Sequence, residues 1–276
     1  MLLYEEPWLN QPQGDAELGG DLPAGTIAYI GGQNRLLGGP AYSAVGVITR
    51  AATVGGLAVS GTTSSYINAG KVAFAQAGSI SWLMQFVIRD SAIRYVSGTL
   101  NTGTSYIERI AVNSDSNTAT PAAGKLAIQL RRVGTAERSC NTAVACLTVG
   151  KVHTAIIQLT DSNTIATWVD GVRQPVTYAS TGAVGLDNGT SEFDYDLINQ
   201  NVRGAHTSGS NVDLLLFARI PRLLPSPENL TQHQSAPWKL FAPLPRRIWA
   251  PGVAGAPFKP AWAIGSNAVI GAGVMV

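Results

Sequence analysis

The chain carries few charged side chains. Asp, Glu, Lys and Arg together make up 13% of its 276 residues, whereas soluble domains commonly reach about 25%. Because surface charge helps to keep a free protein in solution, this scarcity predicts that partners cover much of the surface. The formal net charge of +2 is too small to indicate a nucleic-acid partner.

Cysteine and histidine are also scarce. The spacing of Cys140 and Cys146 permits a disulfide within a loop and equally permits two free thiols, so both alternatives stay open. Two thiols without a nearby histidine cluster predict no zinc site. The three histidines, His153, His206 and His233, are scattered and form neither a metal-binding pair nor the order of a catalytic triad.

Long apolar runs are missing as well. No stretch reaches the roughly 18 uninterrupted apolar residues of a membrane-spanning helix. The first residues, 1–6, lack the basic and apolar regions of a signal peptide. We therefore expect a protein that is made in a cytoplasm, is not conventionally secreted and has no membrane partner.

Three regions differ in composition. Residues 1–44 contain Pro and many Gly with little periodicity, and they predict an extended N-terminal arm. In residues 45–235, runs rich in Val, Ile, Thr, Tyr and Trp alternate with turn residues about every 8–12 residues, which is typical of a β-sandwich. Residues 236–276 form a tail rich in Pro and aromatic residues, which cannot form a regular helix.

Several β-strands are clear in the central region. In the run 155–160, the apolar residues Ala155, Ile157 and Leu159 alternate with others and predict a buried face. The predicted strands span residues 56–59, 79–88, 93–98, 106–113, 125–133, 152–160, 164–169 and 213–219.

Two local sequence patterns predict a turn and a short helix. Asp170 followed by Gly171 predicts a tight turn between two strands. Ser226 followed by Pro227 predicts the N-cap and first residue of a helix of one or two turns.

Four segments of the central region carry a resemblance to a known family. Residues 152–160 contain His153 and are followed by residues 165–171, which end in Val-Asp-Gly; the other segments are residues 57–67, residues 80–86, and residues 212–219 followed by 224–228. Together they resemble, in the same order, the laminin-G-like family of concanavalin-like jelly rolls. The resemblance implies an all-β, concanavalin-like jelly-roll sandwich of two antiparallel sheets, with an extended N-terminal arm and a C-terminal tail. It also implies a packing role for His153.

The tail contains two short motifs. Residues 237–243 read Pro-Trp-Lys-Leu-Phe-Ala-Pro and residues 246–251 read Arg-Arg-Ile-Trp-Ala-Pro. They resemble a segment that follows such domains in bacteriophage structural proteins. The resemblance implies a structural component of a virion, such as a tail fibre, a head fibre or a capsid decoration protein. It implies other virion proteins as partners and a homo-oligomer, expected to be a trimer.

The large aromatic residues of the tail need a groove on their own domain or on a neighbour, since the tail cannot bury them alone. We expect the aromatic residues to be buried in the assembly and the arginines to pair with carboxylates. The predicted assembly contacts are Trp238, Phe241, Arg246, Arg247, Trp249 and Trp262.

A carbohydrate-binding module that adheres to a host-surface glycan is the alternative function. Sugar binding needs exposed aromatic rings, flanked by polar groups, that stack on the apolar faces of pyranose rings. The candidate glycan contacts are Tyr95, Tyr106, Tyr178 and Tyr195.

Catalysis is not expected. Glu192, Asp194 and Asp196 alternate like the acids of sandwich glycosidases, which use one acid as nucleophile and one as general acid. The third acid is an Asp, one methylene shorter, and the run follows a turn at Asp187 rather than lying in a convincing buried strand. We therefore predict a non-enzymatic protein without a catalytic residue.

No cofactor is predicted, and calcium is the one cation that the resemblance suggests. Laminin-G-like domains often bind calcium at the rim through Asp and carbonyl oxygens, which suit a hard cation. The aspartates in apparent loops are Asp115, Asp161, Asp187, Asp194 and Asp196. They show no spaced calcium-loop motif, so ordinary turn residues are the preferred interpretation and no metal site is predicted.

Overall fold

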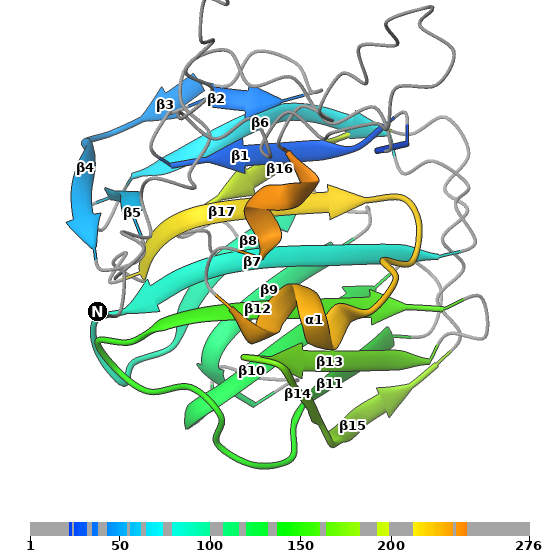
Figure 1. Cartoon of the computed structure of the whole chain (residues 1–276). Helices are drawn as coiled ribbons and strands as arrows, with labels where there is room; N and C mark the ends of the chain where they lie inside the picture. The colour runs from blue at the N-terminus through cyan, green and yellow to red at the C-terminus, as the bar shows by residue number, and fades with distance from the viewer. Residues whose placement is uncertain are drawn as a thin grey trace, which may run out of the picture. The chain divides into compact units, whose positions relative to one another are not determined.

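The computed structural model describes residues 22–23, 25–31, 35–37, 43–53, 56–61, 65–73, 79–99, 107–115, 120–131, 137–160, 164–182, 192–198, 212–233 and 236–241. Most of these residues lie in strands, and the strands form two antiparallel sheets (Figure 1). The predicted all-β sandwich is therefore confirmed. Within this part of the chain, no helix has the length and apolar character needed to cross a membrane.

The first sheet has nine strands in the described part of the chain. Neighbouring strands along its main path are, in order, β14 (Val172–Gln174), β13 (Ile165–Val169), β12 (Val152–Leu159), β7 (Ile80–Ile88), β17 (Val212–Ile220), β1 (Ile27–Ile30) and β2 (Arg35–Leu37). The other two strands are β5 (Gly56–Gly61), which pairs with β17, and β4 (Ile48–Thr53), which pairs with β5.

The second sheet has eight strands among the described residues. In order across the sheet they are β15 (Val176–Thr181), β11 (Glu137–Thr142), β10 (Pro121–Arg131), β9 (Ile107–Ser114), β8 (Arg94–Thr99), β16 (Glu192–Leu197), β6 (Tyr66–Ala73) and β3 (Ser43–Val45).

Every strand predicted from the sequence is present as β5, β7, β8, β9, β10, β12, β13 or β17, with ends displaced by up to about four residues, as is usual for strand ends. The predicted buried face of β12 is also confirmed, because Ala155, Ile157 and Leu159 all lie in the main core. Runs of apolar and β-branched residues therefore identified the strands, and period-two alternation identified the inward side of β12.

The sheets begin upstream of the predicted boundary between residues 44 and 45. Strand β1 pairs with β17 from Ile27 opposite Arg219 to Ile30 opposite Leu216, and all four residues of β1 are buried. This corrects the prediction that residues 1–44 form only an arm, because a four-residue apolar run is enough to complete a buried strand. Residues 1–21 lie outside the described residues.

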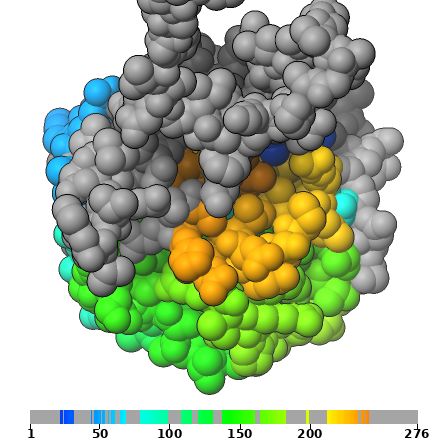
Figure 2. All heavy atoms as spheres, viewed as in Figure 1, coloured from blue at the N-terminus to red at the C-terminus, as the bar shows by residue number. Residues whose placement is uncertain are grey.

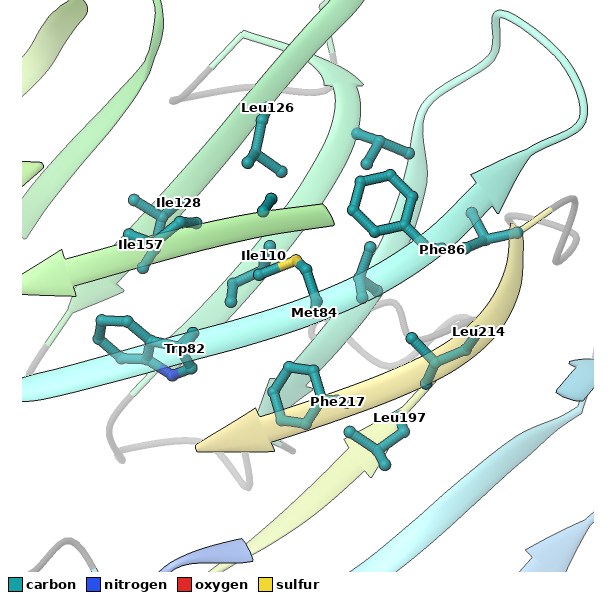
Figure 3. Packing of buried hydrophobic residues seen from close by; sticks show 14 of the residues in the cluster. Trp82, Met84, Phe86, Ile110, Leu126, Ile128, Ile157, Leu197, Leu214 and Phe217 are labelled. Atoms are coloured by element: carbon teal, nitrogen blue, oxygen red, sulfur yellow. The ribbon is translucent and has the colours of Figure 1, made fainter. Parts of the chain in front are cut away.

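The main hydrophobic core lies between the two sheets (Figure 3). All nine residues of β7 are buried. Trp82, Met84 and Phe86 belong to the main core, whereas Leu83 and Val87 belong to a second apolar cluster on the opposite side of the strand. The nine-stranded sheet is thus covered on both faces, which explains why β7 is apolar along most of its length.

Two short helices build this second apolar layer. Helix α1 (Pro227–Gln232) contacts β12, β13 and β14, and the 3-10 helix η2 (Pro237–Leu240) contributes Trp238, with Phe241 next to it. Figure 2 shows the orange atoms of this helical region lying on the face of the nine-stranded sheet. The predicted short helix after Ser226 is therefore present, although the Ser226 side chain makes no capping hydrogen bond.

Helix α1 is fastened to the tight turn between β13 and β14. Asp170 and Gly171 both have positive φ angles, of 49° and 82°, as a two-residue hairpin turn requires, so the predicted turn is confirmed. The Gly171 amide donates to the Thr231 hydroxyl at 3.0 Å. A Cβ atom at Gly171 would lie 3.1 Å from the Cα atom of Gln232, so only glycine fits against the helix without displacement.

Hydrogen bonds of the His153 ring link the same turn to the loop that precedes β12. Its ring is 3% exposed. Nδ1 donates to the Asp170 carboxylate at 2.7 Å, and Nε2 accepts from the Thr148 amide at 2.8 Å. These partners assign the Nδ1–H tautomer. The expected packing role of His153 is confirmed by its burial and its contacts.

An ion pair crosses the main core. Glu108 of β9 and Arg219 of β17 are both fully covered, and Arg219 Nε lies 3.1 Å from Glu108 Oε2. The indole Nε1 of Trp82 donates to Glu108 Oε1 at 2.5 Å. This pair links the two sheets through charged side chains in an otherwise apolar layer.

Candidate functional site

The outer face of the eight-stranded sheet carries a patch of polar and small side chains. Neighbouring residues Ile110, Ile128 and Cys140 lie in the main core, so the residues that alternate with them point away from it. We call this patch the polar face and define it as Tyr95, Arg109, Ala111, Ala127, Gln129, Ser139 and Asn141.

Pairing of strands places these residues in two rows. Tyr95 lies opposite Ala111, Ala111 opposite Ala127, and Ala127 opposite Asn141. In the next row, Arg109 lies opposite Gln129 and Gln129 opposite Ser139. Two alanines at the centre are therefore surrounded by an aromatic ring, a guanidinium group, two amides and a hydroxyl.

Arg109 is held over the ring of Tyr95. Its guanidinium carbon lies 5.2 Å from the ring centroid, and Nη1 lies 3.4 Å from the tyrosine hydroxyl. A cation over an aromatic face is attracted to the ring. This arrangement orients Arg109 over the sheet and covers the ring face of Tyr95.

A slight hollow lies at this patch, too small to admit a water molecule, and Ala111, Ala127 and Gln129 in it are each only 4% exposed. Beyond the polar face, it includes Ser114 and Asp115 at the end of β9. The residues that line it are Arg109, Ala111, Ser114, Asp115, Ala127, Ile128 and Gln129. The hollow therefore combines one cation, one carboxylate, an amide and a hydroxyl over an apolar floor.

Ser139 has an unusual environment on this face. Its side chain is fully buried, and its hydroxyl oxygen has no hydrogen-bond partner. Buried polar groups are nearly always paired, so such a group needs an explanation. It lies beside Gln129, whose amide lines the hollow.

The predicted glycan contacts do not come together. Tyr95 lies on the polar face but is only 8% exposed. Tyr178 instead contacts the nine-stranded sheet, because its hydroxyl accepts from the Ile165 amide at 2.9 Å and its ring packs against the main core. This corrects the expected stacking roles of both residues, since neither presents a free ring face. Tyr106 and the side chain of Tyr195 lie outside the described residues.

The first two predicted assembly contacts belong to the chain's own core. Trp238 is 2% exposed and Phe241 is fully buried, both against the outer side of the nine-stranded sheet. Side chains covered in this way are not available to a neighbouring subunit, so their expected role is corrected to internal packing. The other predicted contacts, Arg246, Arg247, Trp249 and Trp262, lie outside the described residues.

The acidic run after Asp187 is a strand and not a loop. Residues 192–197 form β16, which pairs with β6 on one side and β8 on the other. This corrects the prediction that Asp194 and Asp196 lie in a loop that could hold calcium. Among the residues that the structure describes, no three His, Cys, Asp or Glu side chains are grouped closely enough to hold a metal ion. Asp161 and Asp187 lie outside them.

The two cysteines are free thiols, which decides between the alternatives that their spacing left open. Burial raises the pKa of the Cys140 thiol to about 12. Burial is also the largest cause that raises the pKa of Cys146. Both groups therefore stay protonated at neutral pH, and neither is an activated nucleophile.

No protein-family model matches the chain, and no curated protein matches it in sequence. Solved structures share its fold. The binding domain of botulinum neurotoxin serotype C1 matches with a TM-score of 0.52 and 11% identity, covering 75% of this chain and 50% of that one. A structure of botulinum neurotoxin type C that concerns its interaction with two ganglioside molecules matches with a TM-score of 0.51 and 10% identity, covering 73% and 49%.

An enzyme also shares the architecture. A sialidase of Trypanosoma rangeli matches with a TM-score of 0.50 and 12% identity, covering 84% of this chain and 37% of that one. The chain spans about half the length of the neurotoxin domains that it matches. The chain therefore has a lectin-like fold, an all-β jelly-roll sandwich of two antiparallel sheets.

Proposed function

We propose that this chain is a non-catalytic module that binds a cell-surface glycan through the polar face, and that it does so as part of a bacteriophage particle. The observation that carries the glycan proposal is the lectin-like fold, which the chain shares with a neurotoxin structure that concerns ganglioside molecules. At the polar face, the partly exposed side chains of Arg109 and Asp115 supply hydrogen-bond donors and acceptors.

The chemistry of these two side chains fits sugar hydroxyls. Each hydroxyl donates one hydrogen bond and accepts others, so a sugar is held best by a mixture of donors and acceptors. The neurotoxin structure that concerns ganglioside molecules has the same fold, which supports a sugar-binding use of this architecture.

Absence of catalysis is part of the proposal. Glycosidases commonly use two carboxyl groups that flank the bond to be broken. Of the residues that line the hollow, Asp115 alone carries a carboxyl group. This part of the polar face thus lacks the second acid that cleavage of a sugar would need.

A matched pair of arginine variants tests this site. Arg109 lies over Tyr95, and Arg173 lies over Trp168 at 5.7 Å on the other sheet. We expect Arg109→Ala to weaken glycan binding by at least about tenfold, since a hydrogen bond from a charged donor is lost. Arg173→Ala should bind like the wild type. Binding of full-length protein to an array of bacterial and animal glycans measures both, and thermal unfolding checks that both variants are folded.

The glycan proposal fails if no glycan is bound, or if the two arginine variants lose binding equally. In the second case the contact lies elsewhere or the loss is a general effect on the fold.

The phage setting rests on the sequence of the tail and on the low content of charge. It predicts that residues 245–276 drive assembly, since one compact unit ends at Leu244. We expect the full chain to form an oligomer in solution and a chain that ends at Leu244 to be a monomer. Light scattering after size-exclusion chromatography measures both masses. Two monomers would remove the support for an assembly role and leave a free glycan-binding module.

A further inference from the structure

We infer that strand β15 is a docking edge, to which residues 263–276 of a neighbouring subunit add a further strand. This inference rests on the proposed assembly role of the tail and names the surface that the tail binds. Two observations carry it: an open sheet edge without charge, and a segment of the tail whose composition matches that edge.

Of the described strands that lie at a sheet edge, β15 is the longest without a charged side chain. Strands β14, β2 and β3 have three residues each, and β4, which pairs only with β5, carries Arg50. The six residues of β15 read Val-Thr-Tyr-Ala-Ser-Thr, and among the described strands they pair with β11 alone. Natural edge strands are commonly kept from pairing with other chains by short length, charge or proline. Strand β15 has none of these within its bounds.

The backbone of β15 has groups that face the open side. The Ala143 amide donates to the Pro175 carbonyl at 2.7 Å, just before the strand begins. In an antiparallel ladder, both backbone groups of one residue point to the same neighbour and those of the next residue point to the opposite side. The amides and carbonyls of Val176 and Tyr178 therefore point away from β11, to the side on which no described strand lies.

The side chains of β15 leave this edge accessible. Residues of the strand are alternately half-buried and exposed, and none is fully covered. The register with β11 shifts between Ser139 and Cys140, so that Ala179 has no direct partner. Such a bulge bends the strand, and an added strand must follow the bend. A partner that contains glycine does so most easily, because glycine adopts backbone angles that other residues avoid.

The segment 263–276 has the composition that this edge requires. It contains no charged residue and no proline, so pairing buries no charge and every backbone amide can donate. Ile264, Val269, Ile270, Val274 and Val276 are β-branched, and such residues favour strands. Gly is present at positions 265, 271 and 273, which suits the bend of β15. These residues lie outside the described residues, so this step rests on their sequence.

Addition of a strand also accounts for the low charge of the tail. An apolar segment without charge needs a surface to cover it. Pairing with β15 of a neighbour covers the segment, links two subunits and gives affinity through main-chain hydrogen bonds. Repeated from subunit to subunit, the same contact builds the oligomer that the proposed function expects.

Amide hydrogen exchange at single-residue resolution tests the inference without a substitution. The full chain is compared with the chain that ends at Leu244. We expect the amides of Val176 and Tyr178 to exchange at least about tenfold more slowly in the full chain, because each gains an acceptor on the added strand. The amides of β14, which is an edge of the other sheet, are the control and should exchange equally in both chains.

Lysines on the edge test the same contact in solution. Thr177→Lys together with Ala179→Lys places two charges where an uncharged strand would pair, and edge lysines prevent such pairing in natural sheets. The matched control is Val144→Lys together with Val149→Lys, at exposed positions of the loop between β11 and β12. By light scattering, we expect the β15 double variant to be a monomer and the loop double variant an oligomer. Thermal unfolding checks that both are folded, and the exchange measurement decides if the β15 variant is not.

The outcomes separate this inference from the assembly role of the tail. If the chain that ends at Leu244 is a monomer while the folded β15 double variant is an oligomer, the tail assembles through another surface: the assembly role stands and this inference is overturned. Equal exchange of Val176 and Tyr178 in the full and the shortened chain also overturns it. If the full chain is a monomer, both fall, and protection of β15 would then show that the segment pairs within its own chain.

Discussion

Replacing Trp238 and Phe241 together by alanine is expected to leave the chain mostly unfolded. Trp238 is 2% exposed and Phe241 is fully buried, and each change from such a residue to alanine typically costs about 3–5 kcal/mol. The free energy of unfolding of a whole domain is about 5–15 kcal/mol. A few residues at the end of the described chain therefore hold a large share of the stability.

Urea unfolding followed by tryptophan fluorescence and circular dichroism measures this loss. Leu223→Ala is the matched control, since Leu223 is 41% exposed and a substitution there should change stability by no more than about 0.5 kcal/mol. A chain that ends at residue 235 should behave like the double variant, and one that ends at Leu244 like the full chain. An unchanged unfolding midpoint in the double variant would show that the segment is not part of the core.

Glu108→Ala is expected to destabilise the fold by about 3–5 kcal/mol, the usual cost of removing one partner of a buried ion pair. Arg219 would keep its charge in the core without the carboxylate that lies 3.1 Å from its Nε atom. The Trp82 indole would also lose its acceptor. Desolvation of these two remaining groups, rather than the lost attraction, is the main reason for the large effect.

A double variant separates these causes. Glu108→Gln together with Arg219→Met removes both charges, keeps a carbonyl oxygen for Trp82 and preserves most of the volume. Because uncharged replacements of a buried pair are often neutral or stabilising, we expect the double variant to be more stable than Glu108→Ala. Equilibrium urea unfolding of both proteins gives the comparison. If they are equally destabilised, the charge left on Arg219 is not the source of the loss.

The sequence predicts strands best where burial follows local alternation. Strands β7, β12 and β17 contain long runs of apolar and β-branched residues, so their existence and their ends follow from the pattern. Strand β1 has only four residues and follows a segment rich in Gly. Strand β16 contains three acids and lies within the sheet because β6 and β8 pair with it. The sequence of each segment alone does not show which distant segment it pairs with.

The candidate site was less predictable than the fold. Searching for exposed tyrosines selected Tyr95 and Tyr178, whose surroundings depend on Arg109 and on Ile165. Residues that form the hollow look ordinary in the sequence, because polar positions alternate with core residues in many strands. The sequence pattern that could have indicated the site is the set of polar and small residues at the outward positions of β9 and β10. Their register includes a shift between Pro121 and Leu126, and no sequence pattern fixes such a shift.

The burial of the nine-stranded sheet on both of its faces bears on how this chain can acquire new specificity. Most substitutions in that sheet disturb an apolar layer on one side or the other. Positions that the structure leaves exposed, such as Val172 and Leu223, carry no such constraint. Selection can therefore rewrite these exposed positions freely, whereas the two apolar layers of the nine-stranded sheet must be inherited nearly unchanged.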